Sequence, residues 1–334
     1  MGRVVSQFGR RQFLIVAGLL LGAPVVRAQT AGAASAFHIG VLRGAPDSPL
    51  FRANLHPFIQ ELAENGFREN ENLAVEYRIG LAHGADLVAR ARELVRAGPR
   101  AILAAGPDST VAAAQATREI AIVAVDLETD PVAAGLVKTL GRPGGNVTGL
   151  FLDMPELCGK WLQLLKEVVP RLARVAVLWD STTGPYQRNG AAAAARSTRV
   201  EASILEVKRA EDIDAAMKAA SNARVDGLIV LSSPMLNSFR RQIVVLASQY
   251  RLPAIYLFPE TAEEGGLLAY GPVIKSFFRQ AGGVMVKIFR GARPGDIPIE
   301  RPTKFEFAIN LKTAKALGIS LSPALLFRAD RVIE

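Results

Sequence analysis

The sequence predicts an α/β protein with two lobes, each containing a parallel sheet covered by helices on both faces. The first observation is a series of five short apolar runs before residue 151, with helical patterns between them. Such runs are typical of buried parallel strands. The second observation is that the same order restarts near residue 157. A chain of 334 residues is long enough for two lobes of this kind.

Five strands are expected in the first lobe, at 38–42, 73–79, 101–105, 122–125 and 147–150. Apolar residues recur at helical spacing from Phe51 to Leu62 and from Leu87 to Val95. An Ala-rich helix follows the third strand. Strands that alternate with helices in this way favour a parallel sheet.

The second lobe is expected to begin with a helix whose apolar stripe runs from Leu157 to Val168. Strand-like runs follow at 175–179, 202–207, 227–231, 254–257 and 267–270, helical runs at 211–222, 237–251 and 277–291, and a terminal strand and short helix at 305–311 and 314–317. The pairs Val41-Leu42 and Val177-Leu178 each precede a polar loop that contains proline. This echo supports two lobes of similar order.

Residues 1–28 have the features of a secretory signal peptide. Arg10 and Arg11 precede the apolar stretch Phe13–Ala23, and Val26-Arg27-Ala28 fits a small-residue cleavage pattern. The alternative is a membrane anchor, but a bilayer core requires about 20 apolar residues in a helix. Arg-Arg-Gln-Phe-Leu also resembles a twin-arginine signal. We therefore expect export to the periplasm.

Composition disfavours several classes of function. Removal of residues 1–28, which hold four arginines and no acidic residue, would leave 36 basic against 31 acidic residues. So small an excess does not predict nucleic-acid binding, which favours a clustered basic face. The three histidines lack metal-ligand spacing. Cys158, the only cysteine, lies in an apolar helical stripe and is expected in the core. We expect neither a metal nor a cofactor.

Three polar loops follow predicted strands and open helices. They contain Asp108-Ser109-Thr110, Asp180-Ser181-Thr182-Thr183 and Ser232-Ser233-Pro234. Ligands of parallel α/β sheets bind at the carboxyl ends of the strands, where free backbone N–H groups favour anions. The alternative for each loop is helix capping, because Ser, Thr and Asp are preferred caps.

Aromatic residues lie near these loops, among them Tyr256 and Tyr270. An aromatic ring offers a flat apolar wall to a small ligand, and tyrosine adds a hydroxyl group. The alternative is that these rings fill the core. Asp126, Glu128 and Asp130 are clustered carboxylates that suit a cap or a contact with a ligand ammonium group. No nucleophile with a matching base is recognisable in the sequence, so we expect no catalysis.

Several segments give the chain a family resemblance. They are RRQFL, LGRPGGNVTGL, EEGGLLAYG, RPTKFEFAINLKTAKALGI and LLFRADRVIE. The chain resembles the ABC-transporter substrate-binding protein family related to tryptophan and tyrosine uptake binding proteins. The resemblance implies a type I periplasmic-binding fold, with two Rossmann-like lobes joined by a three-segment hinge. It implies an N-terminal lobe of 37–150 plus 266–298 and a C-terminal lobe of 151–265 plus 299–334.

The resemblance also implies which loops face the ligand. These contain Ser48, Asp108, Ser109, Asp130, Asp180, Ser181, Ser232, Ser233 and Tyr256. Similar sequences often carry an Asn-Pro-Asn-Asn-Pro-like turn where this chain has Asp180–Pro185, and a more polar stretch where it has Leu257–Glu260.

The expected function is that of a periplasmic solute-binding protein of an ABC importer. A monomer would capture an amino acid or an aromatic or organic acid between its lobes and present it to a permease in the inner membrane. Alternatives are a ligand sensor for a membrane receptor and an α/β hydrolase-type enzyme. A repressor of related fold is disfavoured because no helix-turn-helix precedes the first strand.

Overall fold

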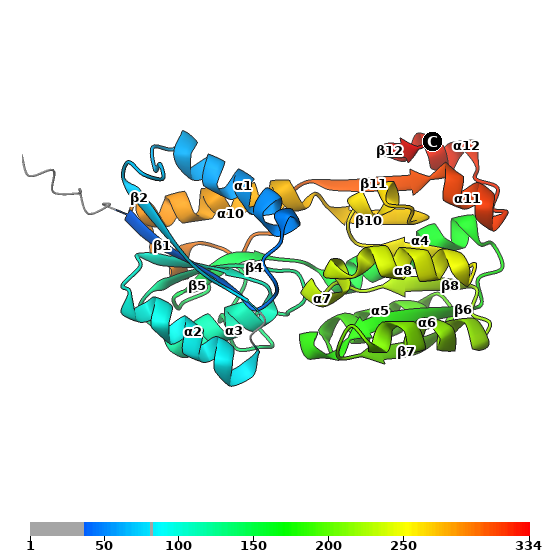
Figure 1. Cartoon of the computed structure of the whole chain (residues 1–334), viewed down its shortest axis with the longest axis horizontal. Coiled ribbons are helices and arrows are strands. Elements are labelled where there is room, and N and C mark those ends of the chain that lie inside the picture. The colour runs from blue at the N-terminus through cyan, green and yellow to red at the C-terminus, as the bar shows by residue number, and fades with distance from the viewer. Residues whose placement is uncertain (1–36, 81–82) are drawn as a thin grey trace, which may run out of the picture. The chain divides into compact units, whose positions relative to one another are not determined.

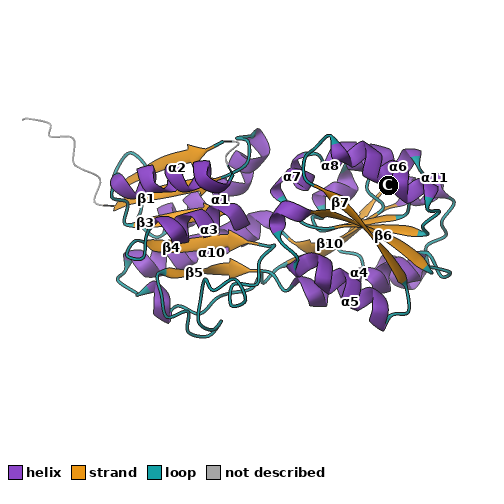
Figure 2. Ribbon diagram, turned by 90° about the horizontal axis from the view of Figure 1, so that it is seen from below, coloured by secondary structure: helices purple, strands orange, loops and turns teal. Residues whose placement is uncertain are grey.

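The structure is a computed structural model that describes residues 37–80 and 83–334. The predicted signal peptide lies outside these residues. Figure 1 shows the order of the elements, and Figure 2 shows the two sheets between their helices.

The first sheet has the strand order β2-β1-β3-β4-β5, and all of its pairings are parallel. Its strands are β1 (Phe37–Arg43), β2 (Leu73–Ile79), β3 (Ala101–Ala105), β4 (Ala121–Asp126) and β5 (Val147–Phe151). Its helices are α1 (Pro49–Glu64), α2 (Gly84–Arg96), α3 (Pro107–Ala116) and α10 (Ile274–Phe289). In Figure 1, α1 and α10 lie on one side of the sheet and α2 and α3 on the other. The five predicted strands are confirmed.

The second sheet has the order β12-β11-β10-β9-β8-β6-β7. Its strands are β6 (Arg174–Asp180), β7 (Glu201–Val207), β8 (Gly227–Val230), β9 (Ala254–Tyr256), β10 (Leu268–Pro272), β11 (Phe305–Asn310) and β12 (Arg331–Ile333). All of its pairings are parallel except that of β10 with β11. The predicted parallel sheet is therefore confirmed except at this one antiparallel pair.

Helices cover both faces of the second sheet as well, as Figure 2 shows for α4 and α5 on one side and α6 and α8 on the other. They are α4 (Met154–Val168), α5 (Tyr186–Ser197), α6 (Asp212–Asn222), α7 (Pro234–Ser238), α8 (Arg240–Gln249), α9 (Glu260–Glu263), α11 (Leu311–Leu317) and α12 (Pro323–Phe327). Two short 3₁₀ turns, Ser181–Thr183 and Pro294–Asp296, complete the described elements. The helix expected over 237–251 is divided at Phe239 between α7 and α8.

Three connections join the two lobes. The first runs from β5 to α4, the second from β10 to α10, and the third from Ile299 to β11. Backbone hydrogen bonds tie them to one another: Glu300 donates to Gly149 at 2.9 Å, Phe151 donates to Glu300 at 3.1 Å, and Val273 donates to Lys304 at 3.0 Å. The predicted two-lobed α/β fold with a three-segment hinge is confirmed.

Two predicted lobe boundaries differ from those in the structure. The segment 266–298 was assigned to the N-terminal lobe, but β10 pairs with β9 and β11 in the second sheet. Only from α10, which packs on α1, does this segment join the first lobe. Likewise, Glu300 pairs with β5 before the chain reaches β11. The position of a strand in the sequence does not reveal which sheet it will join.

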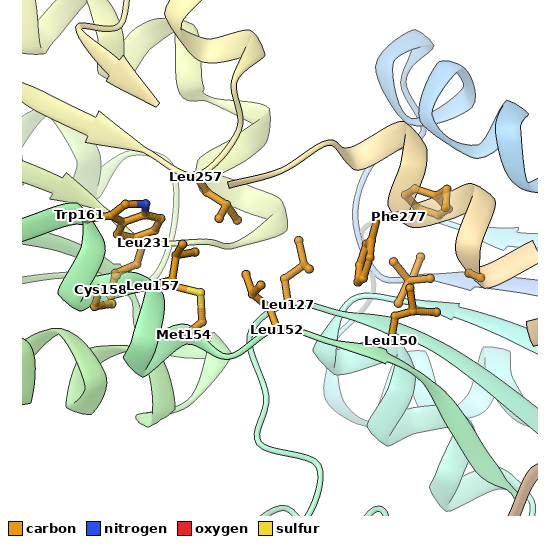
Figure 3. Packing of buried hydrophobic residues seen from close by; sticks show 14 of the residues in the cluster. Leu127, Leu150, Leu152, Met154, Leu157, Cys158, Trp161, Leu231, Leu257 and Phe277 are labelled. Atoms are coloured by element: carbon orange, nitrogen blue, oxygen red, sulfur yellow. The ribbon is translucent and has the colours of Figure 1, made fainter. Parts of the chain in front are cut away.

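A single apolar cluster extends through the hinge. Figure 3 shows Leu127 and Leu152 between a group around Trp161 and Leu231 and a group around Phe277. Cys158 on α4 is fully buried in this cluster, and burial raises the pKa of its thiol to about 12. The prediction that this cysteine fills the core is confirmed. The hinge segments thus pack on an apolar cluster that is continuous between the two lobes.

Substitution of Gly149 in β5 by alanine is expected to destabilise the fold. Gly149 has a φ of +130°, and an added Cβ would lie 2.2 Å from the carbonyl oxygen of Ala124 on β4. Both the backbone strain and the clash should lower the free energy of unfolding, by roughly 2 kcal/mol or more. Urea denaturation measures this change. Gly283→Ala in α10, where a Cβ meets no atom within 4 Å, is the control and should be neutral or slightly stabilising.

Candidate functional site

Two neighbouring cavities lie where the carboxyl ends of the two sheets meet. The Arg43 cavity has a volume of about 260 Å³ and is lined by residues that follow β1, β3, β4, β8 and β9. The Asp180 cavity has a volume of about 480 Å³ and is lined by residues that follow β1, β3, β6 and β8. Both cavities are lined by Pro46, Ala105, Gly106, Pro234, Ser238 and Phe239. They are therefore adjacent compartments of one cleft, placed where parallel α/β sheets bind ligands.

Arg43, the last residue of β1, places a largely buried guanidinium group in the smaller cavity. Its Cζ atom lies 4.2 Å from the ring centroid of Phe51, in cation–π geometry. Its Nε atom is buried and has no hydrogen-bond partner among the described residues. Burial lowers the pKa of Arg43 to about 10, and the negative charge of Glu128 partly offsets this shift. Arg43 therefore remains a cation at neutral pH with unused donor capacity.

The other walls of the Arg43 cavity are mostly apolar. They include Phe51, Leu127, Phe258, Ile274 and Phe278. Ser48 adds a hydroxyl group, which also caps α1 by accepting from the Phe51 N–H at 3.1 Å. A buried cation surrounded by aromatic and aliphatic walls suits a small organic molecule with one anionic group.

A buried hydrogen bond joins the lobes across the cleft. The Ser232 hydroxyl, from the loop after β8, donates to Oε1 of Glu128 at 2.6 Å. Oε2 of Glu128 accepts from the backbone N–H of Leu127 at 3.1 Å. Both oxygens of this carboxyl group are therefore already engaged.

Gln187 on α5 holds Ser232 in position. Its side-chain Nε2 donates to the carbonyl oxygen of Ser232 at 2.8 Å, and its Oε1 accepts from the Ser232 N–H at 2.9 Å. Gln187 is fully buried. Such a two-point amide contact fixes the loop from which the hydroxyl of Ser232 reaches Glu128.

Asp126 and Glu128 form a buried acidic pair. Oδ1 of Asp126 accepts from the N–H groups of Glu128 and Thr129, both at 3.0 Å, while its Oδ2 is buried without a partner among the described residues. Burial raises the pKa of both carboxyl groups, and the charge of Asp126 adds to the shift of Glu128. The pair thus favours protonation relative to ordinary carboxyl groups.

Asp180, at the end of β6, is the buried carboxylate of the larger cavity, with 2% of its surface exposed. Its Oδ1 accepts from the backbone N–H of Thr182 at 3.0 Å and from the Thr182 hydroxyl at 2.7 Å. On the facing lobe, Asp108 lies 2.8 Å from Nδ1 of His83, measured from its Oδ2. The wall also includes Phe239, whose side chain is partly exposed.

The structure brings six of the ten predicted site residues to the cleft. Ser48, Ser232 and Ser233 line the Arg43 cavity, and Asp108, Ser109 and Asp180 line the Asp180 cavity. The capping alternative also holds for some of them, since Ser48 and Ser233 cap α1 and α7. A residue can cap a helix and also line the cleft, because both roles belong to the loop that connects a strand to the next helix.

The other four predicted residues line neither cavity. Asp130 caps its own turn by accepting from the N–H of Val132 and Ala133. The hydroxyl of Ser181 bonds to Glu206 and lowers the pKa of that carboxyl group. Tyr256 borders only a void of about 20 Å³, and Tyr270 stacks on Phe305 with ring centroids 6.0 Å apart. The geometry gives these residues no contact with the cleft, which favours the packing alternative for the two tyrosines.

Sequence reasoning missed Arg43, Gln187 and Phe239 and singled out Asp130 where Glu128 lines the cleft. Arg43 could have been found, because it ends a strand just before a carboxyl-end loop. Glu128 was recognised only as part of a carboxylate cluster, and only the fold shows which member is buried at the cleft. Gln187 carries no sequence signal, since its role depends on a residue 45 positions away.

The described residues contain neither a candidate membrane span nor a candidate metal site. None of the helices in 37–80 and 83–334 is both long and apolar enough to cross a membrane. Over the same residues, no group of three or more His, Cys, Asp or Glu side chains is placed to hold a metal ion.

Comparisons with known proteins agree with the fold. The family model for ABC transporter substrate binding proteins matches residues 48–333. A tyrosine-binding protein of Clostridioides difficile is 25% identical over 266 residues, which cover 78% of this chain and 75% of the relative.

Two solved structures have the same fold. An ABC domain from Streptococcus pneumoniae in complex with L-Trp has a TM-score of 0.82 at 23% identity and covers 90% of this chain and 100% of its own. A conserved domain protein from Vibrio cholerae has a TM-score of 0.82 at 24% identity, over 89% of this chain and 99% of its own. The expectation that the chain is not an enzyme is confirmed by the family. The chain belongs to the family of ABC transporter substrate-binding proteins.

Proposed function

We propose that the protein captures a small organic carboxylate, of the amino acid or organic acid class, in the cleft between its lobes and delivers it to an ABC importer. The observation that carries this proposal is Arg43, a buried cation with unused hydrogen-bond donors beside aromatic walls. A planar guanidinium group pairs with a carboxylate through two parallel hydrogen bonds. A carboxylate of the ligand would therefore accept from the Arg43 donors that no described residue uses.

Size and kinship support this class of ligand. A volume of about 260 Å³ is close to the lower end of small-molecule sites, which begin at about 300 Å³. Phe51, Phe258 and Phe278 suit an apolar or aromatic body next to the carboxylate. The tyrosine-binding relative and the L-Trp complex bind molecules of this kind.

Capture would work by closure of the hinge. Arg43 and Glu128 come from one lobe and Ser232 from the other, so only the closed arrangement completes the cavity. A ligand can shift the balance between open and closed forms only by its greater affinity for the closed form. A permease in the inner membrane would then receive the closed, loaded protein. We place the mature protein outside the cytoplasmic membrane as a monomer, after removal of residues 1–28.

Replacement of Arg43 by glutamine is expected to weaken binding of carboxylate ligands. Loss of a charge-assisted hydrogen bond costs roughly 1.5–3 kcal/mol, which is about a 10- to 100-fold rise in Kd. Thermal-shift screening of the wild type against L-tyrosine, L-tryptophan and other amino and organic acids identifies binders. Titration calorimetry then compares the variants.

The control is Arg241→Gln. Arg241 follows the cleft residue Arg240 in α8, but its own side chain is 79% exposed and pairs with Glu264. It should bind like the wild type. Equal affinity of the Arg43→Gln variant for every carboxylate that binds the wild type would contradict the proposal.

A further inference from the structure

Three buried carboxyl groups, those of Asp126, Glu128 and Asp180, lie in or beside the cleft. Asp126 and Glu128 of the first lobe lie close enough to Asp108 and Asp180 for electrostatic coupling, because Asp108 raises the pKa of Asp126 and Asp180 raises that of Glu128. Arg43 is the cation that acts on Glu128 from the same lobe. Burial makes unpaired charge costly, so a buried carboxylate in the cleft favours a cationic partner.

Asp180 is the carboxylate with free capacity to bind a ligand. The two oxygens of Glu128 are occupied by Ser232 and by the Leu127 N–H. Asp180, by contrast, uses Oδ1 for Thr182 and accepts no hydrogen bond on Oδ2 from any residue that the structure describes. It is almost wholly buried, yet it lines the cavity of about 480 Å³.

The basic side chains around this cavity are paired with other acids. His83 pairs with Asp108 at 2.8 Å, Lys208 with Glu206 at 3.4 Å and Arg209 with Asp212 at 3.3 Å. None of these pairs includes Asp180. Within the described residues, the charge of Asp180 is therefore left for a group that comes from outside the chain.

The two charged anchors lie in different compartments. Arg43 lines the smaller cavity but not the larger, and Asp180 lines the larger but not the smaller. Phe239 is one of the residues that line both cavities. A single ligand that meets both anchors must carry its opposite charges at separated positions.

We propose that the Asp180 cavity is a subsite for a cationic nitrogen group of the ligand, separated by a chain from the carboxylate held by Arg43. This inference rests on the proposed function, which supplies the carboxylate end. An ammonium group would donate to Oδ2 of Asp180, with the hydroxyl group of Thr183 beside it and that of Ser109 on the facing lobe. The chain of the ligand would pass along Phe239. Amino acids with a cationic side chain and ω-amino acids have this pattern.

Two matched pairs of compounds test the subsite without any substitution. L-Lysine is compared with L-norleucine, and 6-aminohexanoate with hexanoate, by titration calorimetry on the whole protein. Each pair shares its carboxylate and chain length and differs in the terminal ammonium group. In each pair, the compound with the terminal ammonium group is expected to bind at least 10-fold more tightly. Equal binding within both pairs would overturn the inference.

The variant Asp180→Asn tests the assigned residue. Asparagine keeps an oxygen that can accept from Thr182, so the fold should be retained, and melting in buffer checks this. In this variant, the ratio of affinities between the compound with the terminal ammonium group and its partner is expected to fall below 3-fold. Asp214→Asn, at an exposed carboxylate outside both cavities that accepts from Gln242, should leave it unchanged. An undiminished advantage in Asp180→Asn would overturn the assignment.

The outcomes separate this inference from the proposed function. If L-tyrosine or L-tryptophan binds through Arg43 while neither L-lysine nor 6-aminohexanoate binds, the subsite is refuted and the proposed function stands. If no carboxylate of any kind binds, both are refuted.

Discussion

Glu128→Gln is expected to stabilise the ligand-free protein at pH 8 and to flatten the dependence of its stability on pH. Glu128 is buried at the cleft and faces Asp126 on its own lobe, Asp180 and Ser232 on the other lobe, and Arg43 on β1. Burial and the neighbouring carboxylates outweigh Arg43 and raise the pKa of Glu128 to about 8. Glutamine has a similar shape and no charge to bury.

Whether stability rises or falls with pH depends on whether the folded or the unfolded state binds the proton of Glu128 more tightly. In the unfolded chain a glutamate has a pKa of about 4.3, so the folded state binds the proton more strongly. The stability that this proton provides is complete below about pH 4.3 and is lost as the pH rises towards 8. Between these two pKa values the loss is on the order of 5 kcal/mol. The neutral amide avoids it and can still bond to Ser232.

Calorimetric melting between pH 5 and pH 9 measures this prediction. The wild type should lose melting temperature with rising pH more steeply than Glu128→Gln. Glu119→Gln, at an exposed position outside both cavities, is the control and should follow the wild type. If the melting temperatures of the wild type and Glu128→Gln depended on pH in the same way, the pKa of Glu128 would not be raised by burial.

Gln187→Leu is expected to impair both folding stability and ligand binding. Leucine has a similar size but leaves the N–H and C=O of Ser232 without the partners that Gln187 provides. Each buried polar group left unpaired costs about 1–3 kcal/mol, so the free energy of unfolding should fall by roughly 2–5 kcal/mol. Displacement of Ser232 should also weaken its bond to Glu128 and thereby disfavour the closed form.

Urea denaturation and calorimetric titration of the same samples distinguish these two effects. Gln249→Leu, an exposed glutamine on α8, is the control and should change neither quantity appreciably. A Gln187→Leu protein with wild-type stability and affinity would remove Gln187 from its assigned role as the residue that positions Ser232.

The sequence revealed the sheets better than their connections. Buried parallel strands such as β3 and β4 are continuous apolar runs, so they are recognisable without any fold. Helix α5 was missed because its alanines give little contrast between a buried and an exposed face. The membership of β10 was misassigned because strand pairing depends on residues far away in the chain.

The candidate site was predictable only in part, for a related reason. Asp108, Asp180 and Ser232 were found because polar residues after parallel strands gather at one edge of a sheet, whereas Ser48 was implied by the family resemblance. Arg43 has a recognisable position at the end of a strand, but only the fold shows that Arg43 and Glu128 are buried across from the second lobe. Burial, which turns a common charged residue into an anchor, is a property of the assembled lobes.

Hydrogen–deuterium exchange tests the central claim that a small carboxylate is captured between the lobes. The protein is compared without ligand and with the tightest binder among L-tyrosine, L-tryptophan and L-lysine. We predict slower exchange in both lobes at once, in the segments 44–51 and 127–129 of one and 232–239 of the other, with α12 unchanged. Protection confined to one lobe, or protection away from these segments, would contradict the account.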